Sequence, residues 1–71
     1  MPRYQDEVKY EIRHVTVMKM TARAVLMRNQ VSKVEFWVPQ SCLSVETLNE
    51  IGEGFIGDVE IAEWLCKKEG I

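Results

Sequence analysis

Few side chains in this 71-residue chain could take part in catalysis. His14 is the sole histidine, and no serine, cysteine or carboxylate stands at a telling spacing from it. Nucleophilic catalysis needs a nucleophile, a base and a group that orients the base. The chain also has no glycine-rich phosphate loop that follows a strand. We therefore expect no enzymatic activity and no cofactor, and a surface or hydrogen-bonded role for His14.

The two cysteines, Cys42 and Cys66, are far apart in the sequence and have no histidine-rich stretch near them. This spacing indicates neither a metal site nor a disulfide framework, so we expect two buried free thiols. No apolar run reaches the roughly 18 residues that span a bilayer. The N-terminal residues 1–7 lack the apolar core of a signal peptide. These features predict a cytoplasmic protein.

The charges are distributed unevenly along the chain. Residues 1–33 carry seven basic and three acidic side chains, whereas residues 34–66 carry seven acidic ones and no Lys or Arg, within a net charge of −2. One interpretation is that the two halves pair across the fold and neutralise each other. The other is a partner surface of one sign, since clustered charge steers association and selects partners. The second predicts a partner-binding surface formed by Glu46, Glu50, Glu53, Asp58, Glu60 and Glu63, together with Trp37.

A strand is predicted over residues 33–38. Its alternation places Trp37 on the face opposite a row of apolar side chains, namely Val34, Phe36 and Val38. Pro39 has no N–H group, so pairing should stop there or the strand should lie at a sheet edge. The exposed position of the Trp37 indole requires a cover, either a partner or the rest of the chain. We expect Trp64 of a C-terminal helix to pack on it as a small second core.

The first half of the chain predicts further strands. Apolar alternation runs over residues 8–19 and changes phase near Arg13 and His14, which predicts one long bent strand with a β-bulge or a barrel corner there. Residues 18–28 fit a helix capped by Thr21 or a strand over 22–28. We favour the strand, in a hairpin with residues 32–38, because a short helix gains little from propensity alone.

The second half leaves one segment open. Residues 42–48 fit a fourth strand, or a short helix capped by Ser44 that ends at Gly52. Residues 52–57 predict a glycine-rich loop, whose Phe55-Ile56 pair either packs back on the core or stays exposed as a contact, and we favour the packed position. Residues 58–61 predict a short strand, and a helix follows over 62–69 with an apolar stripe of Ile61, Trp64 and Leu65.

Together these elements predict a single α+β domain over residues 1–71. The expected architecture is a small antiparallel β-meander or partly open barrel of four to five strands, closed by one C-terminal α-helix. A chain of this length buries only about 60 % of its unfolded surface, so the core must be small.

Two segments resemble a pattern found in small, poorly characterised phage and prophage proteins. Trp37-Val38-Pro39-Gln40-Ser41 resembles their W-I-P-K-S strand end, and residues 61–71 resemble I-P-E-W-L-A-x-x-K-G-L. Residues 21–26 resemble the preceding strand of that pattern. The chain departs from it at Gln40, where the pattern has lysine, and at Ala62, where it has proline. The missing lysine argues against phosphate binding. Size and one-sided acidity also resemble the anti-CRISPR proteins, small inhibitors of bacterial immunity complexes.

Two binding functions follow from these features. The first is an anti-CRISPR-type inhibitor in a bacterial host, whose acidic face occupies the basic groove of a host protein or CRISPR effector complex, since clustered anions compete with nucleic acid for such grooves. The second is a single-stranded nucleic-acid-binding protein with a basic and aromatic platform made of Tyr10, Arg13, Arg23, Arg28, Lys33 and Trp37. Whether the domain is a monomer or a homodimer stays open at this point.

Overall fold

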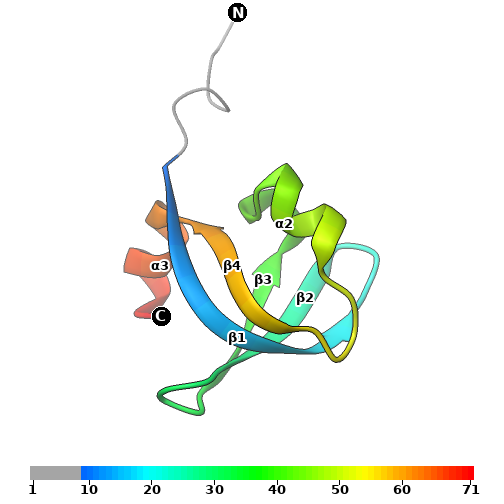
Figure 1. Cartoon of the computed structure of the whole chain (residues 1–71). Coiled ribbons are helices and arrows are strands. Elements are labelled where there is room, and N and C mark those ends of the chain that lie inside the picture. Colours follow the sequence, from blue (N-terminus) through cyan, green and yellow to red (C-terminus); the bar gives the residue numbers. More distant parts are fainter. Residues whose placement is uncertain (1–8) are drawn as a thin grey trace, which may run out of the picture.

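A computed structural model describes residues 9–71. Its elements are β1 (Tyr10–Met20), β2 (Ala24–Asn29), β3 (Glu35–Pro39), a 3-10 turn η1 (Gln40–Cys42), α2 (Val45–Glu50), β4 (Ile56–Ala62) and α3 (Glu63–Glu69). The strands form one four-stranded antiparallel sheet in the order β3-β2-β1-β4 (Figure 1). The first three strands make a meander, and β4 returns to the other side of β1. The α+β class and the C-terminal helix are as predicted, and α2 occupies the segment that the sequence left open between a strand and a helix.

The long first strand bends between its two partners. β1 pairs with β4 from Tyr10 to Thr16 and with β2 from Val15 to Met20. The register shifts between Val17 and Lys19, which makes Met18 the bulge residue. One long bent strand is thus as predicted, but the change of phase predicted near Arg13 and His14 is wrong. The predicted start of this strand at residue 8 lies outside the described residues.

The predicted change of phase does not occur because the side chain of Arg13 points to the inner face of the sheet. Odd-numbered residues of β1 are the less exposed ones from Glu11 to Val17, so the strand keeps one phase through this part. Arg13 can point inward because its Nη2 donates to Glu11 Oε1 at 2.6 Å and to the Ile71 carbonyl oxygen at 2.9 Å. Tyr10 and Ile12 consequently lie on the outer face of the sheet.

The hairpin of β2 and β3 confirms the strand interpretation of residues 22–28. Val25 faces Val38 and Leu26 faces Trp37 across this pair, and β3 is an edge strand that ends at Pro39. The connecting turn is stabilised by Asn29, whose Oδ1 accepts hydrogen bonds from the N–H groups of Val31 and Ser32.

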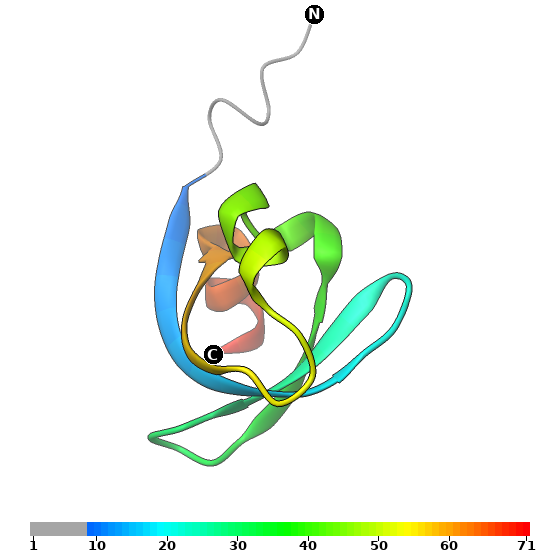
Figure 2. The same cartoon turned by 45° about the vertical axis from the view of Figure 1, so that its right-hand side comes forward.

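The core lies on the concave face of the curled sheet, under α3 and the segment that leads into α2 (Figure 2). It consists of strand residues Val15, Val17, Val25, Met27, Val38, Val59, Ile61 and Ala62 and of Cys42, Leu43, Leu65 and Cys66. The two cysteines are free and buried, as predicted. Phe55 packs against this core, as expected, whereas the expectation that Ile56 packs back with it is wrong, because Ile56 is exposed on β4. Within residues 9–71, no helix combines the length and apolar character needed to cross a membrane.

The open segment after β3 contains a helix capped by Ser44. Ser44 Oγ accepts a hydrogen bond from Thr47 N at 3.1 Å, which satisfies one of the free N–H groups in the first turn of α2. Thr47 Oγ1 in turn accepts from Glu60 N at 3.0 Å, and Ser44 N donates to Glu60 O at 3.3 Å. These bonds fix α2 against the outer edge of β4.

The replacement Thr47→Val is expected to lower the free energy of unfolding by about 1–2 kcal/mol. The shape of the side chain stays nearly the same, but the Glu60 N–H loses its acceptor in a part-buried place. The midpoint of urea denaturation measures this loss. The reverse exchange at an exposed position, Val31→Thr, serves as a control and should change stability by less than about 0.5 kcal/mol. Equal stability of Thr47→Val and the parent chain would contradict the role given to this hydroxyl.

Candidate functional site

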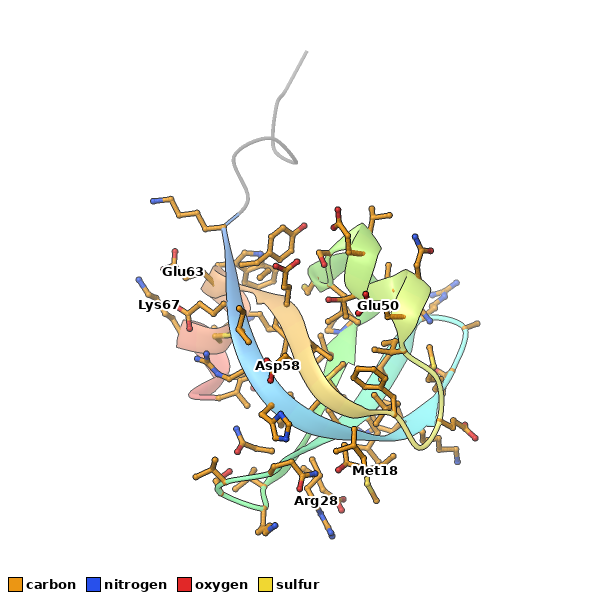
Figure 3. All side chains as sticks on the ribbon, viewed as in Figure 1. Met18, Arg28, Glu50, Asp58, Glu63 and Lys67 are labelled. Carbon is orange, nitrogen blue, oxygen red and sulfur yellow. The ribbon has the colours of Figure 1, made fainter. Side chains whose placement is uncertain are left out.

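Four of the predicted acidic residues meet beside α2. Glu46 and Glu50 are separated by one helical turn and so lie on one face of α2. Asp58 and Glu60 are two residues apart on β4 and share one face of that strand. Because α2 is fixed to β4, these carboxylates line one open hollow of about 370 Å³ together with Ile12 and Thr47. Figure 3 shows Glu50 on α2 and Asp58 on β4 on the same side of the molecule. We call this hollow the acidic cleft.

The acidic cleft has few counter-charges. Among residues 9–71, Asp58 alone of its four carboxylates has a basic side chain beside it, since its Oδ1 lies 3.0 Å from His14 Nδ1, and both of these side chains are exposed. Glu46, Glu50 and Glu60 form no ion pair with any described residue. Their charges therefore add to one another on the surface.

Neutralisation between the two halves of the chain is slight in the described residues. Of the seven carboxylates between residues 34 and 66, one pairs with an arginine of the first half, through Glu35 Oε2 and Arg28 Nη2 at 3.1 Å. The second interpretation of the charge pattern, an unneutralised acidic surface, is the one that this arrangement fits.

The other three predicted site residues lie elsewhere. Glu53 Oε2 accepts a hydrogen bond from Met20 N at the far end of β1. Glu63 forms an ion pair with Lys67 one turn later on α3, at 3.7 Å. Trp37 lines a groove between β3 and α3 that is separate from the acidic cleft. The structure thus brings together four of the seven predicted residues.

Exposed apolar side chains adjoin the acidic cleft. Ile12 lines it and is 62 % exposed. Glu46 also lines a second hollow, shared with Tyr10 and Val45, and Val45 is 69 % exposed. Apolar side chains that are rimmed by charges are typical of protein interaction sites. The sequence did not point to Ile12, because the apolar alternation of residues 8–12 is what a side chain on the core face would also show. No local signal in the sequence marks Ile12 as exposed, because Arg13 faces inward through its hydrogen bond to Ile71, 58 residues later.

The predicted second core of two tryptophans is not formed. Trp37 is 50 % exposed and Trp64 is 56 % exposed, although both line the groove between β3 and α3. α3 buries Leu65 and Cys66 in the main core instead, which turns Trp64 toward the rim of the groove. The expectation that Trp64 buries Trp37 is therefore wrong.

The remaining candidate residues have structural partners or are buried. Burial raises the pKa of the Cys42 and Cys66 thiols, so less of each is thiolate at neutral pH. Within residues 9–71, no group of three or more His, Cys, Asp or Glu side chains is arranged to hold a metal ion. In the proposed nucleic-acid platform, Arg13 is held by Glu11 and Ile71, and Tyr10 and Trp37 line different hollows.

Comparisons with known proteins add no family assignment. No family model, no curated protein and no solved structure matches this chain.

Proposed function

We propose that this protein acts by binding, and that its acidic cleft docks on a positively charged surface of a nucleic-acid-binding complex, in the manner of an anti-CRISPR inhibitor. The observation that carries the proposal is the grouping of Glu46, Glu50, Asp58 and Glu60 around one hollow with so few counter-charges.

The residues that line the cleft suit basic side chains of a protein partner. A lysine or arginine carries an apolar stem below its charged head. Ile12 at the cleft offers an apolar surface for such a stem, while the carboxylates of α2 and β4 accept hydrogen bonds from the head. Tyr10 and Val45 extend the apolar contact beyond Glu46.

Such binding would exclude nucleic acid by competition. The basic grooves of nucleic-acid-binding complexes are lined with lysine and arginine that neutralise phosphates. A protein that presents several carboxylates on a rigid scaffold occupies the same cations. Inhibition therefore requires no catalysis, in agreement with the expected lack of enzymatic activity.

A plasmid interference assay tests the proposal in cells. The full chain is expressed in bacterial strains that carry a CRISPR system of each major type, and the efficiency of transformation by a targeted plasmid is measured. We expect restored transformation in at least one strain, with a purified effector complex of that type binding the protein in solution. Unchanged interference in every strain would contradict the inhibitor role.

The quadruple variant E46Q/E50Q/D58N/E60Q tests the acidic cleft itself. We expect at least about tenfold weaker binding to the effector complex and a weaker dependence of affinity on salt, because charge-assisted contacts are lost. The control E35Q/E53Q/E63Q/E69Q removes the same number of charges outside the cleft and should bind within about threefold of the parent chain. Equal losses in the two variants would mean that net charge, not the cleft, determines binding.

A further inference from the structure

The two edges of the sheet differ in what covers them. At the β4 edge, the backbone N–H and C=O groups of Glu60 are both bonded to the segment that contains α2, through Thr47 Oγ1 and Ser44 N. At the β3 edge, no hydrogen bond from residues 9–71 reaches the backbone groups that face away from β2. An uncovered edge is a template for another strand.

The free groups of β3 follow from its pairing with β2. Asn29 N donates to Val34 O, and Gln40 N donates to Arg23 O, so the even-numbered residues of β3 point their backbone groups toward β2. In an antiparallel strand the bonded side alternates with each residue. The N–H and C=O groups of Glu35 and Trp37 therefore face outward, and so does the C=O group of Pro39.

Large apolar side chains accompany this edge. Trp37 and Trp64 are each about half exposed and line, with Val34, a groove of about 670 Å³ beside β3 and α3. Tryptophan is enriched in the centres of protein interfaces, where its burial contributes strongly to affinity.

We infer that a second copy of this chain pairs with this edge, β3 against β3 in antiparallel order and centred on Trp37. A two-fold axis at Trp37 places the Trp37 N–H of each copy opposite the Trp37 C=O of the other. It also places each Glu35 N–H opposite the Pro39 C=O of the other copy. The edge is thus complementary to itself, as the interface of a symmetric dimer must be. The missing N–H of Pro39 leaves one acceptor per copy, Glu35 C=O, without a strand partner.

Side-chain charge agrees with this register. The two Trp37 indoles lie on one face of the joined sheet as a cross-strand aromatic pair. Each Glu35 lies opposite Pro39 of the other copy and not opposite the second Glu35, so like charges stay apart. The ion pair of Glu35 with Arg28 within each copy is retained.

Sedimentation equilibrium of the full chain, from about 1 μM to about 1 mM, tests the inference. We expect a reversible dimer, and at least tenfold weaker dimerisation for W37K, because a charge at an edge opposes strand pairing. I56K places the same charge at another exposed strand position, on β4, and should dimerise like the parent chain. A chain that is monomeric up to about 1 mM, or a W37K variant that dimerises like the parent, would overturn the inference.

The register has its own test. The Cα atoms of a hydrogen-bonded antiparallel pair are about 5.5 Å apart, within the range of about 4.4–6.8 Å that a disulfide spans. At a concentration where W37C is dimeric, mild oxidation should therefore give a covalent dimer, whereas I56C should not. A dimer of W37C that fails to cross-link would overturn the register centred on Trp37.

Discussion

The variant Ile61→Ala is expected to be largely unfolded at 25 °C. Ile61 has no exposed surface, and it lies where the main elements of the core meet. It pairs with Glu11 of β1, forms a bridge with Leu43 before α2, and lies two residues before α3 begins. Loss of such a side chain costs about 2–5 kcal/mol through lost burial and the remaining cavity. A chain of this size has only about 3–5 kcal/mol of stability in total.

Ile56→Ala is the matched control for this prediction. It makes the same change in the same strand, at a side chain that is 67 % exposed. Its effect should stay within about 0.5 kcal/mol, since little burial is lost. Circular dichroism during urea denaturation measures both variants. Similar midpoints for the two would mean that the core is not centred where the structure places it.

The second large effect concerns the two thiols. Cys42 and Cys66 are 4 % and 2 % exposed, so an alkylating reagent reaches them only after the structure opens. If opening requires most of the unfolding free energy, their reaction in the native protein should be about 10²–10³ times slower than in urea. In the closed structure, burial also raises the pKa of both thiols, so little thiolate is present there at pH 8.

Mass spectrometry after timed alkylation at pH 8 gives the rate for each cysteine. The rates in Ile61→Ala should approach those of the urea-unfolded chain, and the rates in Ile56→Ala should stay near those of the parent. Reaction of Cys66 at the unfolded rate in the parent chain would mean that α3 separates from the sheet without global unfolding.

Several elements were predictable because their signals are local. Pro39 cannot donate a ladder hydrogen bond, which predicted the end of β3 and its edge position. Gly70 adopts a left-handed conformation with φ of 70°, as its place after the predicted C-terminal helix suggests. For the segment of α2, the Ser44 cap indicated a helix, but a strand was an equal alternative, and the sequence did not decide between the two. The choice depends on Glu60, whose backbone groups bond to Ser44 and Thr47.

The acidic cleft was predictable only in part. The absence of basic residues over 34–66 indicated the charge of the surface. Which carboxylates share it depends on α2 lying against β4, whereas Glu53 is bonded to Met20 at the far end of β1 and Glu63 lies on α3. Charge composition does not contain that information. Residues that are far apart in the sequence come to lie on one side of the fold only through tertiary contacts.

The sequence by itself therefore determined the strands, the hairpin, the C-terminal helix and the segregation of charge. The tertiary structure alone decided which faces are buried. Periodicity shows which side chains share a face, but not what lies across from it. Arg13 points inward because Ile71, 58 residues later, accepts its hydrogen bond, and this places Ile12 outside beside the carboxylates. Likewise Leu65, and not Trp64, enters the core, which leaves Trp37 half exposed at an open edge.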